Sequence, residues 1–320
     1  MNKLLISTVA TFFLLMFCAS STYASETATE KITIILDWFP NPDHAPIIIA
    51  KALGYFGEED LDVELIGPAD PTDPPKWVAA KRADIGITYQ PEFMQQVDRN
   101  MPLISIGSLI DKPLDCIIAL EDGNIHSIKD LKGKRIGSGT GGTSAIMLKT
   151  MLKNNGLGIN DVELINVRYS LTQALLARKV DAVTGMMRNF EIPQIESKGQ
   201  HVVAFLPEEN GIPNYSVLIF IANRENANDP RFPRFMTAVK KAVTWLSKHP
   251  QTGWEIYTKQ YPESNNSVNH DAWFATMPYF AANPAKLNRD EWQNFAEFML
   301  ENHMIHKRQL IARYAIEFVK

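Results

Sequence analysis

The stretch ITIILDWFPNPDH, from Ile32 to His44, decides the fold. Its first five residues are mostly apolar and β-branched, which predicts a buried strand over Ile32–Leu36. The next eight residues bring acids, aromatic rings, an amide and an imidazole to the end of that strand. Because ligands of open α/β sheets bind beyond the carboxyl ends of the strands, this cluster indicates recognition of a small ligand.

Strands and helices alternate along the rest of the N-terminal region. The pattern predicts a helix, a strand, a helix and a strand in turn, over Pro46–Gly54, Leu61–Ile66, Pro74–Arg82 and Ala83–Thr88. The last strand delivers Tyr89 and Gln90 to the sheet edge. This order predicts a mostly parallel sheet that is covered on both faces.

A second α/β series follows and predicts a second lobe. Its expected strands are Cys116–Leu120, Lys134–Gly137, Val162–Val167, Ala182–Gly185 and Val202–Leu206, and its expected helices are Ser144–Asn154 and Leu171–Arg178. Tyr215–Ala222 is a further apolar strand, and helical patterns such as Phe235–Ser247 and Glu291–Glu301 dominate the remainder. The chain is expected to cross between lobes near 114–118 and to return near 215–219, so residues 25–115 and 216–320 form lobe 1 and residues 116–215 form lobe 2.

The N-terminus has the pattern of a secretion signal. Lys3 supplies positive charge, an apolar run extends over Leu4–Phe17, and small residues precede a cleavage site after Ala24. We therefore expect residues 1–24 to be a cleaved signal peptide and the mature protein to be periplasmic. Cleavage would remove Cys18 and leave Cys116 as the single cysteine, which excludes an internal disulfide.

Composition narrows the classes of function. The formal net charge is -4 over 320 residues, and this mild acidity argues against nucleic acid, which rewards clustered Lys and Arg. The sequence shows no cysteine pair and no close His-x-x-x-His spacing for zinc. His44 has no nucleophile motif beside it, so a structural role for this histidine is the alternative to a ligand contact.

Several motifs together resemble the NMT1/THI5-like family. They are residues 38–44, Gly54-Tyr55-Phe56, Ala83-Asp84-Ile85-Gly86, residues 131–137 (LKGKRIG) and Asn189-Phe190-Glu191. This family includes periplasmic binding proteins for thiamine pyrimidine precursors, notably formylaminopyrimidine, and the fungal thiamine-pyrimidine synthases. The resemblance runs from about Lys31 past Leu246, and its most specific part is Trp38 to His44.

The resemblance implies a fold and a mode of action. The fold would be a two-lobed α/β periplasmic binding protein of type II, with the ligand in the interlobe cleft. The partner would be an ABC permease with a cytoplasmic ATPase, and the protein is expected to be a monomer that needs no cofactor. The ligand would be a pyrimidine of the formylaminopyrimidine or hydroxymethylpyrimidine type.

Two differences from the fungal enzyme of the family favour a binding protein. The lysine that holds pyridoxal phosphate in the fungal enzyme aligns with Thr88, and the histidine that donates nitrogen aligns with Glu92. A threonine has no amine with which to form a Schiff base. The enzyme's cysteine cluster aligns with Gly211–Ser216, which contains no thiol.

The candidate ligand-binding residues supply rings, hydrogen bonds and a loop. A flat aminopyrimidine needs aromatic stacking and a few directed hydrogen bonds. We expect Trp38 and Tyr215 to face the ring, and polar groups to reach its edge or its substituent from Asp37, Asn41, His44, Tyr89, Gln90, Arg188, Asn189, Glu191 and the loop Gly139, Thr140, Gly141, Gly142 and Thr143.

Each of these assignments has a structural alternative. Trp38 could pack in the core, Tyr215 could begin the returning strand, Glu191 could be a surface acid, and Asp37 could cap a turn. The glycine-rich loop before a helix suits an anion or a carbonyl, but a tight turn explains it equally well.

Ligand identity stays open at the level of the sequence. Arg188 stands where the bacterial binders carry Trp, and Ser216 stands where they carry Asp, which could favour a more acidic or more oxygenated ligand. A receptor for riboflavin, taurine or nitrate shares the scaffold, because fold does not fix the ligand. An exported, degenerate enzyme of pyrimidine metabolism is a further alternative.

Overall fold

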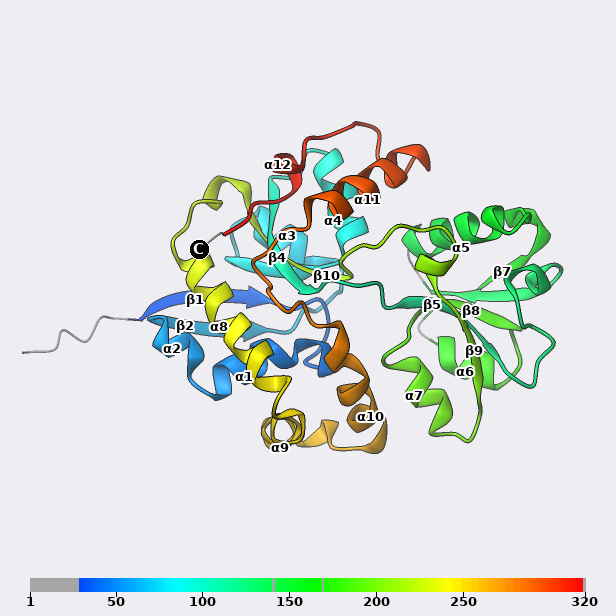
Figure 1. Cartoon of the computed structure of the whole chain (residues 1–320), viewed down its shortest axis with the longest axis horizontal. Coiled ribbons are helices and arrows are strands. Elements are labelled where there is room, and N and C mark those ends of the chain that lie inside the picture. Colours follow the sequence, from blue (N-terminus) through cyan, green and yellow to red (C-terminus); the bar gives the residue numbers. More distant parts are fainter. Residues whose placement is uncertain (1–28, 140–141, 169, 319–320) are drawn as a thin grey trace, which may run out of the picture.

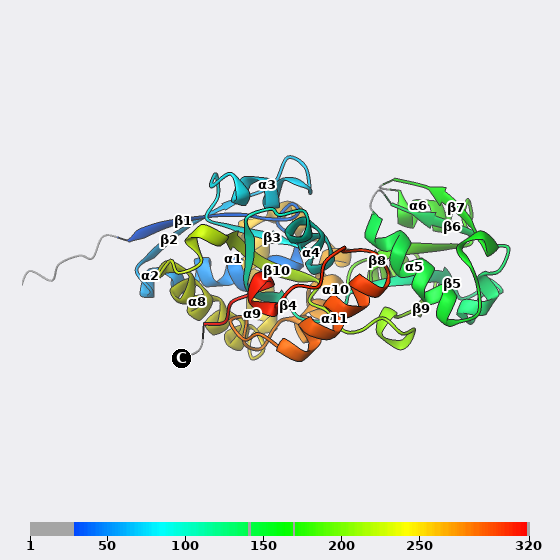
Figure 2. The same ribbon diagram turned by 90° about the horizontal axis from the view of Figure 1, so that it is seen from above.

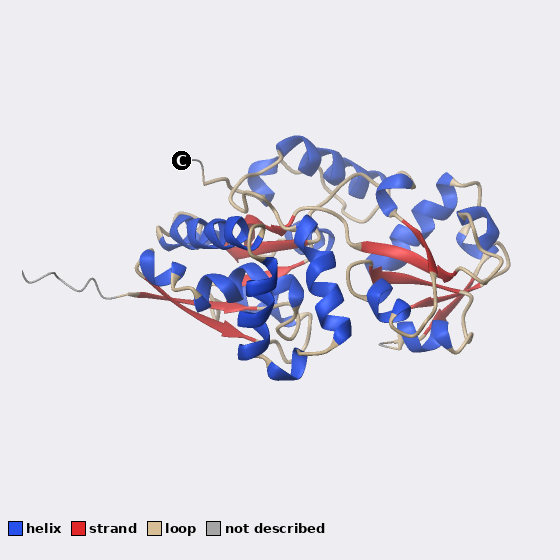
Figure 3. Ribbon diagram, turned by 60° about the horizontal axis from the view of Figure 1, so that its bottom comes forward, coloured by secondary structure: helices blue, strands red, loops and turns tan. Residues whose placement is uncertain are grey.

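The computed structural model describes residues 29–139, 142–168 and 170–318. Its helices and strands form two α/β lobes that lie side by side (Figures 1 and 2). In each lobe, helices cover both faces of a central sheet (Figure 3). No helix within the described residues is long and apolar enough to cross a membrane.

The sheet of the larger lobe has the strand order β2-β1-β3-β10-β4. These strands are β1 (Glu30–Ile35), β2 (Leu61–Ile66), β3 (Ile85–Thr88), β4 (Leu103–Ile110) and β10 (Leu218–Asn223). β1 pairs in parallel with β2 and β3, whereas β10 is antiparallel to both of its neighbours. The four strands other than β10 therefore share one direction.

The sheet of the smaller lobe has the order β7-β6-β8-β5-β9. Its strands are β5 (Asp115–Leu120), β6 (Arg135–Ser138), β7 (Glu163–Asn166), β8 (Ala182–Met187) and β9 (Val202–Phe205). Here β5 is the strand that runs antiparallel to its neighbours. The prediction of mostly parallel sheets missed these reversals, which occur at the first strand after each passage between the lobes.

The helices cover these sheets and form the C-terminal region. They are α1 (Ala45–Ala52), α2 (Tyr55–Glu58), α3 (Asp73–Ala79), α4 (Gln90–Asp98), α5 (Gly142–Asn154), α6 (Leu171–Leu176), α7 (Glu191–Glu196), α8 (Arg231–Leu246), α9 (Pro250–Gln260), α10 (Ser267–Thr276), α11 (Arg289–Glu301) and α12 (Ile311–Tyr314). Short 3-10 turns are η1 (Pro42–His44), η2 (Ile128–Leu131), η3 (Ile159–Asp161), η4 (Pro207–Glu209), η5 (Arg224–Asn226), η6 (Pro262–Ser264) and η7 (Met277–Tyr279).

The main hydrophobic core lies around the larger sheet and continues into the smaller lobe. Ile32, Ile34 and Ile35 of β1 are fully buried, as the apolar pattern predicts. The same buried cluster includes Ile117 of β5, and a separate cluster around Val183 covers the other face of the smaller sheet. The strand ends that face the second lobe are therefore anchored by buried hydrophobic packing.

The strand β1 ends where the polar cluster begins, and a capped turn fixes its geometry. Asn41 Oδ1 accepts a hydrogen bond from the backbone N–H of Asp43 at 2.8 Å, and Asn41 Nδ2 donates to the carbonyl of Phe39 at 3.1 Å. Pro42 begins η1, where its fixed φ is already suited to the turn. This short turn passes directly into α1, so the whole cluster is tied to a buried helix.

Candidate functional site

A cavity of about 510 Å³ lies between the two lobes, at the ends of β1, β3 and β8. Its lining comes from both lobes. It consists of Asp37, Trp38, Phe39, Pro40, Asn41, Asp43, Tyr89, Leu114, Leu171, Thr172, Gln173, Met187, Phe190, Glu191, Gln194, Val217, Leu218, Ser264 and Asn269. We call it the interlobe cavity, and its size suits a small organic ligand.

The first polar group of the cavity is the Asp37 carboxylate. His44 Nδ1 accepts a hydrogen bond from the backbone N–H of Asn41, so the ring proton lies on Nε2, which donates to Asp37 Oδ1 at 2.9 Å. Tyr89 donates its hydroxyl proton to Asp37 Oδ2, also at 2.9 Å. Burial and the nearby Asp37 raise the pKa of Tyr89 well above its usual value, so this phenol keeps its proton.

Glu191 enters the cavity from the smaller lobe, at the first residue of α7. Its Oε2 accepts a hydrogen bond from the backbone N–H of Met187 at 2.6 Å. Burial disfavours the charged carboxylate and raises the pKa of Glu191 to about 7, with a smaller contribution from Asp43. This carboxyl can therefore hold or release a proton near neutral pH.

A polar bridge joins the lobes beside the cavity. Asn189 of the smaller lobe donates from Nδ2 to Asp43 Oδ1 at 2.6 Å and to Thr276 Oγ1 at 2.8 Å, both in the larger lobe. Asn189 is 2% exposed and Thr276 is fully buried. The contact lies where α7 packs against α10. Burial raises the pKa of Asp43 to about 6, although the neighbouring His44 partly opposes this effect.

The aromatic side chains at the start of the site stay accessible. Trp38 is 41% exposed and Phe39 is 67% exposed, and their rings meet edge to face at 6.1 Å. Trp38 lines the interlobe cavity and is not packed in the core, so its ring remains accessible for stacking.

Three candidate residues are located at the crossovers and do not line the cavity. Arg188 is ion-paired with Glu208 at 2.6 Å and donates to the carbonyls of Leu114 and Asp115. Tyr215 is 2% exposed, stacks on Phe295 at 4.7 Å and donates its hydroxyl proton to the Asp115 carboxylate.

Gln90 is likewise fully buried, and its Oε1 accepts from the backbone N–H of Ser216 at 2.6 Å. The structure therefore gives Arg188, Tyr215 and Gln90 contacts that tie together the segments joining the lobes.

The structure describes only part of the glycine-rich loop. Gly139 follows β6, Gly142 begins α5, and Thr143 lies in its first turn. Thr140 and Gly141 fall outside the described residues, as does the side chain of Thr143. The described part of the loop does not contribute to the cavity lining, and its expected role stays a prediction.

Sequence reasoning found Glu191 at the start of α7 but missed Gln194 of the same helix and the lining from α6 and the C-terminal helices. Thr172 donates to Gln194 Oε1 at 2.7 Å, which links α6 to α7 along the wall of the cavity. The ends of β7 and β8 precede these helices, so the rule that ligands lie beyond the carboxyl ends of strands could have found them. Ser264 and Asn269 come from a helical region where no sequence pattern points inward.

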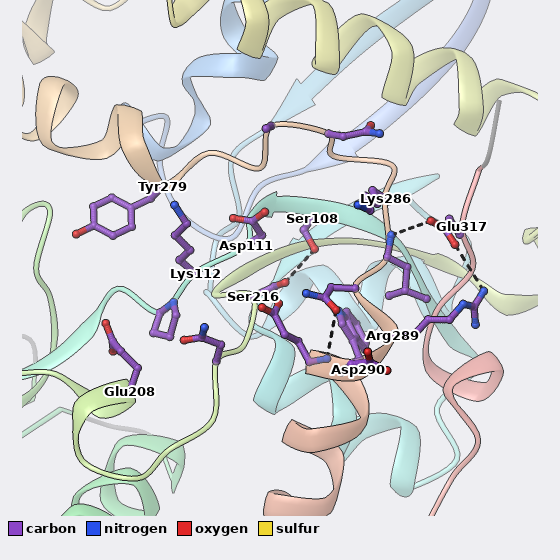
Figure 4. Close-up of a pocket in the computed structure, with 18 residues that line it drawn as sticks. Ser108, Asp111, Lys112, Glu208, Ser216, Tyr279, Lys286, Arg289, Asp290 and Glu317 are labelled. Atoms are coloured by element: carbon purple, nitrogen blue, oxygen red, sulfur yellow. Dashed lines mark hydrogen bonds and ion pairs between the residues drawn. The ribbon is translucent and has the colours of Figure 1, made fainter.

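A second and larger cavity, of about 880 Å³, lies elsewhere along the crossovers (Figure 4). On one side of it Ser108 and Ser216 share a hydrogen bond at 3.0 Å. Charges of both signs surround it: the cations are Lys112, Lys286 and Arg289, and the acids are Asp111, Glu208, Asp290, Glu291 and Glu317. We call it the crossover cavity.

A metal ion or a Schiff base needs particular side chains from the described residues. Among them, no group of three His, Cys, Asp or Glu side chains is close enough together to hold a metal. Thr88, which the family resemblance aligns with the cofactor lysine of the fungal enzyme, is 4% exposed and ends β3. Cys116 is buried, and burial raises the pKa of its thiol, so the thiol stays protonated.

The fold and the cleft define a class of protein, the two-lobed α/β binding proteins. Among solved structures, the aliphatic sulphonate binding protein SsuA of Escherichia coli matches 89% of this chain and 96% of its own, with a TM-score of 0.72 at 16% identity. At that identity the likeness concerns the fold alone.

The chain belongs to the NMT1/THI5-like family, whose model matches residues 41–253. A Haemophilus influenzae protein assigned to thiamine biosynthesis is 43% identical over 91% of this chain and 93% of its own. The formylaminopyrimidine-binding protein of Halalkalibacterium halodurans is 28% identical over 82% of this chain and 80% of its own. The resemblance drawn from the sequence motifs is thereby confirmed, as is the α/β binding-protein fold.

Proposed function

We propose that this protein captures a pyrimidine precursor of thiamine, of the formylaminopyrimidine or hydroxymethylpyrimidine type, for an ABC importer. The observation that carries the proposal is the interlobe cavity, where an accessible Trp38 faces polar groups held by both lobes. Membership of the NMT1/THI5-like family and the 28% identity to a formylaminopyrimidine-binding protein support it.

The site supplies the two kinds of contact that an aminopyrimidine needs. Trp38 stacks on one face of the ring, where an aromatic contact adds about 0.5–1.5 kcal/mol beyond the area it buries. Glu191 and Asp37 accept hydrogen bonds from ring or exocyclic N–H groups, and Asn41 adds an amide at the rim. The hydrophobic walls Leu114, Phe190 and Val217 exclude water.

Closure of the lobes around the ligand is part of the same proposal. Lobe 1 comprises residues 25–115 and 216–320, and lobe 2 comprises residues 116–215. Asn189 holds the closed arrangement through Asp43 and Thr276, while Arg188 and Tyr215 fix the crossovers. Residues 1–24 direct export to the periplasm, and the closed protein, acting as a monomer, is recognised by a permease with a cytoplasmic ATPase.

A binding role without turnover is the form of the proposal we favour. The position of the cofactor lysine is held by Thr88, and residues 211–216 contain no cysteine. A purified protein that bound the pyrimidine reversibly and left it chemically unchanged would agree with this view. Conversion of the pyrimidine, with or without pyridoxal phosphate, would contradict it.

The experiment is a thermal-shift screen of the protein from Ser25 onward, followed by calorimetric titration. Formylaminopyrimidine, hydroxymethylpyrimidine, riboflavin and ethanesulfonate are compared. A ligand at 100 times its Kd stabilises the native state by about 2.7 kcal/mol. We expect a shift with the aminopyrimidines and 1:1 binding. A shift with riboflavin or ethanesulfonate alone would replace the proposed ligand.

A further inference from the structure

The charges that line the interlobe cavity are of one sign. Asp37 and Asp43 line it from the larger lobe, and Glu191 lines it from the smaller lobe. Within the described part of the chain, the lining contains no Lys, Arg or His. A cleft lined by one sign of charge with low-dielectric walls concentrates the opposite charge.

The three carboxyl groups differ in how many hydrogen bonds their oxygens already accept from the protein. Asp37 is held by His44 and Tyr89, one on each oxygen. Asp43 receives a hydrogen bond from Asn189, whose own Oδ1 is buried and has no hydrogen-bond partner among the described residues. Glu191 accepts hydrogen bonds from the backbone N–H groups of Met187 and of Glu191 itself, and from no side-chain donor or cation among the described residues. Acceptors that lack a donor are thus left at the junction of the two lobes.

Among the described residues around Glu191, no cation is free to neutralise it. Arg188, three residues earlier, is already paired with Glu208, and the Cys116 thiol of β5 is uncharged. The segments β8, β9 and α6 carry no titratable side chain within their bounds.

On α10, which packs against α7, His270 and Asp271 are paired with each other at the surface. The remaining charged neighbour is Asp43, across the lobe boundary, and it raises the pKa of Glu191.

We propose that the cavity selects a ligand that is bound in a protonated, cationic form, with a ring nitrogen of a basic heterocycle sharing its proton with Glu191. This inference deepens the proposed function and rests on it, because it concerns the ligand of the same cavity. The ring nitrogen lone pair takes the proton from solvent or from Glu191, and the resulting N–H donates to the carboxylate. No electrons are exchanged and no other bond changes.

The positive charge also bears on closure. Asp43 and Glu191 come from opposite lobes and repel each other when both are ionised, and this repulsion grows as water leaves the cleft. A cationic ligand between the lobes offsets the repulsion, so the closed state forms with the charged ligand and not with an anion. An anion such as a sulphonate would meet carboxylates of its own sign in this cavity.

The test measures protons taken up on binding. Formylaminopyrimidine is titrated at pH 8 in phosphate and in Tris, whose ionisation enthalpies differ, so the apparent heats report the number of protons. At that pH the free ring is neutral and Glu191 is mostly ionised. We expect uptake of about one proton per ligand and an affinity that falls up to tenfold per pH unit above about pH 7.

Variants separate the role of Glu191 from general damage. Glu191→Gln should abolish proton uptake and flatten the pH dependence, and Asp43→Asn should change both measures less. Glu301→Gln is the matched control, because Glu301 is exposed at the end of α11. The melting temperature of each variant reports whether it folds.

The outcomes distinguish this inference from the proposed function. Tight binding with no proton uptake, or uptake that persists in Glu191→Gln, would overturn the inference and leave the pyrimidine receptor in place. Absence of binding by every pyrimidine, with binding of ethanesulfonate, would overturn both. Proton uptake that is lost in Glu191→Gln and retained in Glu301→Gln would support it.

Discussion

The interlobe cavity and the crossover cavity both contain many charged side chains, but they differ in whether those charges are compensated. In the crossover cavity, cations stand among the acids: burial raises the pKa of Asp111, and Lys112 partly offsets that effect. In the interlobe cavity, the pKa of Glu191 and the pKa of Asp43 are raised without an arginine or lysine nearby. Size and charge count therefore do not distinguish the two cavities, and we infer the ligand site from the uncompensated acceptors at strand ends.

The largest expected effect comes from removing one carboxyl group from each cavity and comparing the loss of ligand binding. Glu191→Ala should weaken formylaminopyrimidine binding roughly 100-fold, because a hydrogen bond to a charged group contributes about 1.5–3 kcal/mol. Glu291→Ala, in the crossover cavity, should leave the Kd unchanged within twofold. Calorimetric titration measures both. Equal losses in the two variants would end the distinction between the cavities.

The interlobe bridge gives the next largest effect. Asn189→Ala removes donors to Asp43 and Thr276 in the closed state, so closure becomes less favourable by about 1–2 kcal/mol and affinity should fall about fivefold to thirtyfold. Small-angle scattering with saturating ligand should show a more open average shape than wild type. Asn265→Ala, at an exposed position, serves as the control. An unchanged scattering profile together with unchanged affinity would argue against the bridge.

The stacking contact should have a smaller effect. Trp38→Ala should weaken pyrimidine binding about tenfold, because stacking and the burial of one ring face are both lost. Trp38→Phe should restore most of that loss, since it keeps an aromatic face. The change in tryptophan fluorescence on titration of the wild type, absent in both variants, assigns the signal to this residue. Full affinity in Trp38→Ala would exclude the stacking role.

The smallest expected effect is a difference between the two cavities in how stability depends on pH. The folded-state pKa of Glu191, about 7, lies above its unfolded value of 4.5, so the unfolded chain binds fewer protons between these values. Stability should therefore fall as pH rises through this window. Glu191→Gln should gain about 1 kcal/mol relative to wild type between pH 5 and pH 8, after a discount for its exposure to the cavity.

Urea unfolding at the two pH values measures this gain. Glu291→Gln provides the comparison from the crossover cavity. Burial and Asp111 raise the pKa of Glu291, but a hydrogen bond with Asn288 opposes them, so the expected change is smaller. A wild-type protein whose stability relative to Glu191→Gln does not change with pH would show that the carboxyl titrates in the native state as it does in the unfolded chain.

Much of the fold follows from the sequence, because buried strands and amphipathic helices carry strong periodic signals. β2 occupies the predicted residues, and β1, β6, β9 and α11 differ by one or two residues at their ends. The helix α4 was not predicted, since its polar sequence QPEFMQQVD has little apolar periodicity. The reversed direction of β5 and β10 depends on the passage between lobes, which no local pattern encodes.

The site could be predicted only where the strand-end rule and a motif agreed. Asp37, Trp38, Asn41, Tyr89 and Glu191 all line the interlobe cavity. Arg188 directly precedes the Asn189-Phe190-Glu191 motif and Tyr215 precedes β10, but both turn toward the crossovers, where Glu208 and Asp115 bind them. Which way a side chain turns at a strand end is decided by partners that are distant in the sequence, so residue type and spacing could not supply it.

The most direct test of the account is hydrogen–deuterium exchange of the protein with and without formylaminopyrimidine, because it reports on both cavities at once. The account predicts slower exchange in peptides covering residues 37–44, 187–196 and 267–276, with no change in residues 279–292. Protection confined to residues 279–292 would place the ligand in the crossover cavity and contradict the assignment of the site.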